Sequence, residues 1–442
     1  MIYWAPFLHF YQPPIQFPRV LKRICNESYR PLVKMFLKHK KAKVTINICG
    51  VLTELLDSHG AEDIINDIGK LALSGQLEFV DSGKYHPIFP LIPQREIQRQ
   101  LKLNHKANKA FFGKVYKPKG VFPPEMGYSE DTAKVIKALG YKWILLAGIA
   151  CSDAWPFDFI PEISFNGSSI LVFYRDDILS NKISFQNLDS ASFIKELAKL
   201  AENKEDSYII TAMDAETFGH HIQNWEEIFL AEVYKTISKI KDMHQHSSVK
   251  QRRNLVQTHK NIFFGLKEIP QIEVVTISEL LYKFSKKKAI APKPSSWSTT
   301  KEDICKGDYY PLWKGVGNRI HDLQWEHINI CFSLTEQALS LQDNKEANRF
   351  GLIARGLLDR AIHSCQFWWA NKNRGTWDIN LINKGLLLQE EVVLNACKAI
   401  SISALDKAAK KNFYSKVAAC REVAVKIRDL LLEEGQTVSI VE

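Results

Sequence analysis

The stretch Tyr208–His221 reads Tyr-Ile-Ile-Thr-Ala-Met-Asp-Ala-Glu-Thr-Phe-Gly-His-His, and it decides the predicted fold. An apolar run of strand length stops at two carboxylates, Asp214 and Glu216, which are followed by an aromatic ring, a glycine and the pair His220 and His221. Parallel strands in α/β proteins are buried on both faces, and the loops at their carboxyl ends carry the chemistry. A structural interpretation stays open, in which Asp214 caps the next helix and the histidines lie on the surface.

A second segment, residues 120–129, also runs from a short apolar strand to a carboxylate: Gly-Val-Phe-Pro-Pro-Glu-Met-Gly-Tyr-Ser. Pro123 and Pro124 restrict the backbone and remove amide donors just before Glu125, which holds that side chain in a fixed direction. Two carboxylates at strand ends are what cleavage of a glycosidic bond requires, because one attacks the anomeric carbon and the other protonates the leaving oxygen. Glu125 and Asp214 are therefore the candidate catalytic residues.

Strand and helix patterns alternate along residues 1–285 and predict a parallel α/β barrel. The predicted strands are Met1–His9, Val44–Ile48, Gly75–Val80, Gly120–Phe122, Trp143–Ala147, Ile170–Tyr174, Tyr208–Met213 and Ile272–Val275. The predicted helices between and after them include Ser28–Lys38, Arg95–Phe112, one beginning at Ser129, Ala191–Ala201 and one beginning at Ser278.

Polar and aromatic residues lie in or just after these strands, and the rim of the predicted barrel would bring them together. They are His9, Gln12, Glu78, His86, Trp155, Arg175, Glu216 and His220.

The pattern changes after residue 285. Residues 286–314 are rich in Lys, Pro, Ser and Thr, but Trp297 and its aromatic neighbours are too apolar for a free linker, so we expect an ordered lid or crossing loop. Residues 315–442 read as a helical domain. Apolar residues at spacings of four and three, from Phe413 to Leu431, form one stripe that must pack against partner helices.

One cluster in the helical part, His363–Asn371, crowds aromatic and amide groups at a helix end. Gln366, Trp368 and Trp369 are candidate substrate contacts if this cluster forms the far wall of a sugar cleft. The alternative is a purely structural cluster.

Composition excludes several classes of protein. The chain has 442 residues and a formal charge of +10, but its lysines are dispersed and match no nucleic-acid-binding motif. The eight cysteines contain no C-x-x-C pair, so they are typical of reduced, mostly buried thiols rather than of a disulfide framework or a zinc site. No secretion signal or membrane-spanning run is apparent, which favours a cytoplasmic protein without a membrane or nucleic-acid partner. The oligomeric state is not indicated.

Taken together, these segments resemble glycoside hydrolase family 57, the retaining α-glucan-active family of amylases, 4-α-glucanotransferases and branching enzymes. The resemblance rests on the order and spacing of four short motifs: His9-Phe10-Tyr11-Gln12-Pro13, Gly75-Gln76-Leu77-Glu78, Phe122-Pro123-Pro124-Glu125 and Met213-Asp214-Ala215-Glu216-Thr217-Phe218-Gly219-His220. It implies an incomplete, seven-stranded (β/α) barrel with a C-terminal helical region that contributes to the cleft.

The resemblance also implies roles. Glu125 would be the nucleophile and Asp214 the general acid and later the base, with no cofactor and with an α-glucan as substrate. Retention of configuration requires carboxyl groups about 5 to 5.5 Å apart, and a general acid requires a raised pKa. Trp155, Trp297, Trp368 and Trp369 would be stacking platforms. His9, His86, Glu78, Arg175 and His220 would bind sugar hydroxyls or orient the carboxylates, and Gln12, Glu216 and Gln366 would also contact the substrate. Two positions depart from the family pattern, since Tyr11 replaces a second histidine and Gln366 replaces an acidic residue.

Two other functions stay open at this point. A metal-dependent carbohydrate deacetylase would use Asp and His ligands at strand ends, here drawn from His9, His86, Asp214, His220 and His221. A non-catalytic glucan-binding protein would keep the cleft without turnover.

Overall fold

The computed structural model describes residues 1–151, 153, 155–165, 167–201, 205–246, 271–341 and 344–435. The chain divides into two compact units. The first unit contains Met1–Gln12, Gln16–Lys84 and Phe89–Trp297, and the second contains Pro13–Ile15, Tyr85–Ile88 and Ser298–Glu442.

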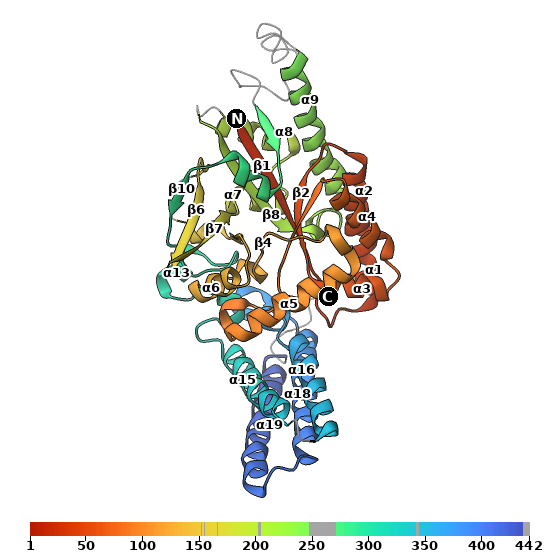
Figure 1. The fold of residues 1–442 in the computed structure, drawn as a ribbon, viewed down its shortest axis with the longest axis vertical. Coiled ribbons are helices and arrows are strands. Elements are labelled where there is room, and N and C mark those ends of the chain that lie inside the picture. Colours follow the sequence, from red (N-terminus) through yellow and green to blue (C-terminus); the bar gives the residue numbers. More distant parts are fainter. Residues whose placement is uncertain are drawn as a thin grey trace. The chain divides into compact units, whose positions relative to one another are not determined.

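The first unit is built around strand β1 (Ile2–Phe10), whose residues are all buried (Figure 1). β1 pairs in parallel with β8 (Ser207–Asp214) along its length, and with β2 (Val44–Ile48) from Phe7 onward. β9 (Ile272–Val274) pairs with Ile2–Trp4. Pro6 has no N–H to donate, and it falls between the β9 and β2 pairings, where a central strand tolerates a proline.

The remaining barrel strands extend this sheet. β3 (Leu77–Val80) pairs with β2, and a second sheet contains the parallel strands β4 (Gly120–Val121), β5 (Trp143–Leu146) and β7 (Ser168–Tyr174). A parallel bridge between Asp81 and Val121 joins β3 to β4. The Asp176 amide donates to the Ile210 carbonyl oxygen at 2.7 Å, and this bond links β7 to β8. The ring therefore runs β1-β2-β3-β4-β5-β7-β8.

This ring is incomplete at the junction of β7 and β8. The antiparallel strand β6 (Ile160–Phe165) pairs with the first residues of β7, and β10 (Lys287–Ala289) pairs with the other edge of β6. Because β6 covers that edge of β7, β8 cannot pair with β7 there. The fold is thus the expected α/β class, an incomplete seven-stranded barrel, followed by a helical region.

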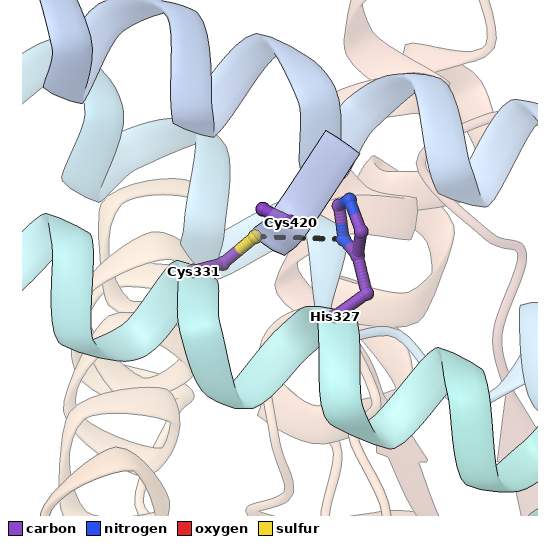
Figure 2. Close-up of side chains that lie close together, drawn as sticks. All are labelled: His327, Cys331 and Cys420. Atoms are coloured by element: carbon purple, nitrogen blue, oxygen red, sulfur yellow. Dashed lines mark hydrogen bonds between the residues drawn. The ribbon is translucent and has the colours of Figure 1, made fainter. Parts of the chain in front are cut away.

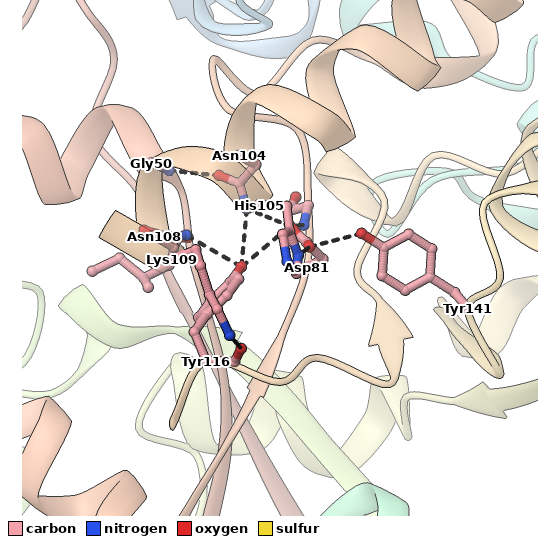
Figure 3. A network of polar contacts seen from close by, with 10 residues as sticks. Gly50, Asp81, Asn104, His105, Asn108, Lys109, Tyr116 and Tyr141 are labelled. Carbon is pink, nitrogen blue, oxygen red and sulfur yellow. Dashed lines mark hydrogen bonds and ion pairs between the residues drawn. The ribbon is translucent and has the colours of Figure 1, made fainter. Parts of the chain in front are cut away.

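The junction of β3 and β4 is held by a buried polar network around Asp81 (Figure 3). Its Oδ1 accepts from Asn104 Nδ2 at 2.7 Å, from the Tyr116 hydroxyl at 3.2 Å and from the Ser82 amide at 3.1 Å. Its Oδ2 accepts from the Tyr141 hydroxyl at 2.7 Å and lies 3.0 Å from His105 Nδ1. The carboxylate is fully buried, and these donors offset the cost of removing it from water.

Helices cover the strands of the first unit, and their apolar faces make its core. They are α1 (Pro18–Ile24), α2 (Arg30–Lys38), α3 (Gly50–Ser58), α4 (Glu62–Leu73), α5 (Gln94–Phe112), α6 (Glu130–Ala138), α7 (Asp177–Ser184), α8 (Ser190–Ala201), α9 (Glu232–His246) and α12 (Ile277–Lys283). Ser129 caps α6 through its side chain, as its position before two acidic residues predicts.

The second unit is helical. Its long helices are α15 (Arg319–Leu339), α16 (Lys345–Ala361), α18 (Ile379–Ser401) and α19 (Lys407–Gly435). They pack on one another, and the α19 stripe is buried at Phe413, Cys420, Ala424, Ile427 and Leu431 and half-buried at Val417 (Figure 1). Shorter elements are α13 (Lys301–Lys306), α14 (Pro311–Lys314), α17 (Cys365–Trp368) and the hairpin β11 (Ala370–Asn371) with β12 (Thr376–Trp377).

Several segments differ in detail from the sequence-based expectations. Residues 286–314 contain the strand β10 and two short helices, which their Lys- and Pro-rich composition does not reveal. The strand β6 was missed. The helix expected from Ser278 begins at Ile277 behind a capping box of Thr276 and Glu279. The helix expected from Ser28 starts inside a π-helical turn, Cys25–Tyr29. None of the helices in the described part of the chain is long and apolar enough to cross a membrane.

Candidate active site

Glu125 projects from a turn with unusual backbone geometry. It follows β4 in the 3₁₀ turn Pro124–Met126 and has a φ of 61°, in the left-handed region that non-glycine residues rarely adopt. Trp297 contacts it twice: the indole N–H donates to Glu125 Oε2 at 2.9 Å, and the Trp297 amide donates to the Glu125 carbonyl oxygen at 3.0 Å. Strain of this kind concentrates at functional sites, where the surrounding structure holds it in place.

Aromatic contacts connect this turn to the end of β1. The His9 ring stacks on Phe122 with centroids 4.7 Å apart, and it makes a T-shaped contact with Trp297 at a centroid distance of 5.9 Å. Tyr11 also stacks on the His9 ring, with centroids 5.9 Å apart. His9 Nδ1 bonds Asn47 Oδ1 at 2.9 Å, and burial lowers the pKa of His9 to about 4, so the imidazole is neutral at physiological pH.

Asp214 is the last residue of β8 and pairs in register with His9. Its side chain is half-buried, and none of the described residues hydrogen-bonds its carboxylate. Burial raises the pKa of Asp214 to about 6, and the nearby Arg175 guanidinium opposes that rise. This pKa agrees with the value expected of a general acid near neutral pH. The helix-capping alternative is wrong, because the Asp214 side chain caps no helix.

Glu216 lies two residues further on and forms a second buried carboxyl group. It accepts from the Gln12 amide at 2.6 Å and from the Tyr29 hydroxyl. Burial and the charge of Asp214 raise the pKa of Glu216 to about 8, although both donors favour its charged form. The two coupled carboxyl groups therefore keep at least one proton at neutral pH.

Arg175 and Trp155 also lie in the first unit. The Arg175 guanidinium donates to the Ala212 carbonyl oxygen, Asp177 Oδ1 and Asn181 Oδ1, each at 2.7 Å, so it is fixed beside the end of β8. The half-buried Trp155 packs edge-on against Phe157 with centroids 4.5 Å apart.

His220 has a different environment from Asp214. Its Nδ1 lies 2.6 Å from Glu27 Oε2, and burial lowers the pKa of the adjacent His221. Gly219 permits this approach, because a Cβ there would lie 1.8 Å from the Glu27 carbonyl oxygen. The structure thus gives His220 an ion-pair partner near the surface.

Glu78 has a structural partner instead of an open environment. Its Oε2 accepts from the Ser278 amide in the first turn of α12 at 2.9 Å, a favourable position for a carboxylate because the helix dipole is positive there. Glu78 lies near the start of β3, in register with Thr45. Its carboxylate thus bonds Ser278 of α12 and not the residues around Asp214.

The remaining predicted contacts belong to the second unit. Gln366 is fully buried there, and its amide bonds the Ala361 and His363 carbonyl oxygens and Gln389 Nε2. This side chain has no capacity left for a sugar. Trp368 and Trp369 are half-buried and pack edge-to-face with centroids 4.5 Å apart. His86 has a φ of 57°, and its Nδ1 lies 2.9 Å from Ser364 Oγ.

The sequence that contains the barrel residues was compared with known protein families. Residues 11–262 match the profile of glycosyl hydrolase family 57, which is more than half of the chain. The chain belongs to this family.

Curated relatives match about half of the chain. An α-amylase of Pyrococcus horikoshii is 28% identical over 244 residues, which cover 52% of this chain and 37% of that protein. A 4-α-glucanotransferase of Thermococcus litoralis is 26% identical over 221 residues, which cover 48% of this chain and 32% of that protein. The match thus spans only about a third of the length of these relatives.

Solved structures of the family share the fold. A family 57 branching enzyme from Thermococcus kodakaraensis aligns with a TM-score of 0.67 at 14% identity, covering 97% of this chain and 95% of that one. The α-amylase AmyC of Thermotoga maritima aligns with a TM-score of 0.62 at 15% identity, covering 94% and 96%. Both the barrel and the helical region therefore have counterparts in family 57.

The sequence did not indicate three residues of this candidate site. Tyr29, which bonds Glu216, lies in a π-helical turn with no local signal. Asn47 and Phe122 contact His9. Asn47 had a usable signal, since it is an amide side chain near the carboxyl end of a fully buried strand.

The donor atoms expected of a deacetylase do not gather in the barrel. Among the described residues, the one group of three His, Cys, Asp or Glu side chains spaced for a metal ion is His327, Cys331 and Cys420, in the second unit. His220 instead pairs with Glu27, and His86 with Ser364.

Proposed function

We propose that this chain is a retaining enzyme of α-linked glucans, in which Glu125 is the nucleophile and Asp214 is the general acid and base. The observation that carries the proposal is the contact chain from Glu125 through Trp297 to His9, the register partner of Asp214. A carboxylate held by a donor and a carboxyl group with a raised pKa are the two parts that glycosidic cleavage needs.

In the first step, a Glu125 carboxylate oxygen forms a bond to the anomeric carbon while the bond from that carbon to the leaving oxygen breaks. Asp214 gives its proton to the leaving oxygen. In the second step, Asp214 takes a proton from the acceptor hydroxyl, which attacks the anomeric carbon and releases Glu125. The Trp297 N–H orients Glu125 for attack from one fixed direction.

Arg175 limits how far burial raises the pKa of Asp214 in this proposal. The charge of Asp214 in turn raises the pKa of its buried neighbour Glu216. His9, neutral and fixed by Asn47, is placed to bond a sugar hydroxyl, and Gln12 positions Glu216.

The substrate class rests on the relatives, which are named α-amylase, 4-α-glucanotransferase and branching enzyme. Hydrolysis and transfer share the first step and differ in whether water or a sugar hydroxyl is the acceptor. We also keep three further predictions. The domain boundaries follow residues 285 and 314, the protein is cytoplasmic, and Trp155, Trp368 and Trp369 stack on the sugar.

The test is a product analysis on maltooligosaccharides and longer α-glucans. The wild type should release shorter sugars if it hydrolyses, and products longer than the starting sugar if it transfers. Glu125→Gln should lose activity by on the order of 10⁴-fold or more while still binding the sugar. A fluorinated glucosyl fluoride, which slows the second step, should add one glycosyl group to the peptide that contains Glu125.

Three results would contradict the proposal. A label on another residue would exclude Glu125 as the nucleophile. Equal inactivity of the wild type and Glu125→Gln, with both binding the sugar, would favour a glucan-binding protein. Release of acetate from acetylated sugars, abolished by chelation, would favour the deacetylase.

A further inference from the structure

Three side chains that the proposed reaction does not use converge inside the second unit. His327 and Cys331 lie one turn apart on α15, and Cys420 faces them from α19 (Figure 2). One nitrogen and two sulfur atoms of these residues lie within 4.8 Å of one another, and all three side chains are buried.

The distances within this group suit a small tetrahedral ion. Four-coordinate Zn²⁺ takes Cys sulfur at about 2.3 Å and His nitrogen at about 2.0–2.1 Å, which separates the ligand atoms by roughly 3.5–3.8 Å. His327 Nδ1 and Cys331 Sγ are already 3.7 Å apart. Modest closure of the remaining separations would bring all three atoms to bonding distance.

An oxygen atom stands beside the group. Gln389 on α18 places its Oε1 at 2.7 Å from His327 Nδ1, and its Nε2 donates to Gln366 Oε1 at 2.6 Å. The second bond fixes the direction of the amide, so its carbonyl oxygen points toward the imidazole. An amide oxygen only accepts, so His327 Nδ1 donates this hydrogen bond. Gln389 Oε1 can supply a fourth donor once zinc replaces the proton on Nδ1 and the two atoms move apart to ligand spacing.

We propose that His327, Cys331 and Cys420 form a structural zinc site in the second unit, with Gln389 Oε1 completing it. Zinc binds the thiolate forms of both cysteines and the unprotonated Nδ1 of His327, and the protons that these groups lose go to solvent. Two thiolates and an imidazole favour soft or borderline ions such as Zn²⁺ over Mg²⁺ or Ca²⁺. The ion would join α15, α18 and α19.

The first test measures metal in the purified full chain. Wild type expressed with zinc should retain about one ion per chain after gel filtration. Refolding with Co²⁺ in place of zinc should give the intense absorption of thiolate-to-cobalt charge transfer. Cys331→Ser and Cys420→Ser should lose both signals. Cys397→Ser is the matched control, because Cys397 is a half-buried thiol of the same unit outside this group, and it should keep both.

A second measurement uses the wild type alone, in case the variants fold poorly. Maleimide labelling in mild denaturant should leave two more thiols unmodified with zinc than after chelation, and chelation should lower the melting temperature.

The proposal is overturned by any of three results. The wild type binds neither zinc nor Co²⁺ in stoichiometric amount; or Cys397→Ser loses the metal along with the other two variants; or the intact mass is lower by two hydrogens, which would mean that Cys331 and Cys420 form a disulfide.

Discussion

Asp81 and Asp214 stand at corresponding places in the barrel, each at the carboxyl end of a strand, yet their surroundings differ. Asp81 is fully buried and has donors on both oxygens, from Asn104, Tyr116, Tyr141 and His105 among others. Asp214 is half-buried, and none of the described residues donates to it.

The difference separates two uses of one side chain. Donors around Asp81 stabilise its charge and join β3 to β4, so its carboxylate has no capacity for a substrate. Asp214 lacks such donors, and its raised pKa keeps a proton available. The proposed role of Asp214 as the general acid fits this difference, because a carboxyl group without protein donors can bond a substrate.

Within the comparison of Asp81 with Asp214, the largest expected effect is the loss of catalytic rate in Asp214→Asn. This variant should lower kcat/KM by on the order of 10²–10⁴-fold, because the leaving oxygen loses its acid. Its free energy of unfolding should stay the same or increase, because a carboxyl group that resists ionisation is removed. Substrates with an activated leaving group should recover much of the rate of the first step. A large loss of stability would erase the contrast with Asp81.

The converse substitution, Asp81→Asn, should act on stability. The donors around residue 81 would lose a charged acceptor, which should lower the free energy of unfolding by on the order of 3 kcal/mol. Urea denaturation measures this change. The folded fraction should keep kcat/KM within a few-fold. A normal stability combined with a large rate loss would assign Asp81 to the chemistry instead.

Trp297→Phe sharpens the contrast at Glu125. The variant keeps an aromatic ring and removes the N–H that bonds the carboxylate, so kcat/KM should fall roughly tenfold. Trp377→Phe is the matched control, since the Trp377 indole N–H has no hydrogen-bond partner among the described residues. Equal effects of the two substitutions would contradict the role of this bond.

The smallest effect concerns His105. Its bond to Asp81 raises its pKa, so its contribution to stability is complete below the ordinary pKa of about 6.5 and is lost as pH rises through the folded value. Because His105 is partly exposed, the contribution should be only a few tenths of a kcal/mol. Urea unfolding of wild type and His105→Gln should differ more at pH 5.5 than at pH 8. A difference that grows with pH would reverse the assignment.

The sequence predicted most of the barrel because its strands are short apolar runs with distinct polar ends. β2 matched its predicted residues, and β8 delivered Asp214 as expected. β6 and β10 were missed, since β6 is interrupted by Pro161 and Glu162 and β10 reads Lys-Lys-Ala. Their pairing comes from tertiary contacts, which leave no local pattern.

Individual side chains were harder to assign than strands. Glu125 and Asp214 lie at strand ends, where a position in the sequence fixes a position on the rim. Gln366 is a polar residue within an aromatic segment, and the sequence cannot tell whether its amide faces solvent or other buried amides. The His327 cluster has the same difficulty, because Cys420 is far from Cys331 in the chain and only the packing of α19 on α15 brings them together.

The backbone at Glu125 has a consequence for the evolution of this barrel. A positive φ is a conformation that glycine adopts without strain, so Glu125→Gly should fold more stably than Glu125→Ala, by about 1 kcal/mol. Selection for stability alone would therefore favour glycine at this turn. A chain that keeps glutamate there retains a residue with backbone strain, so this position should be among the first to change in any descendant that lost its activity.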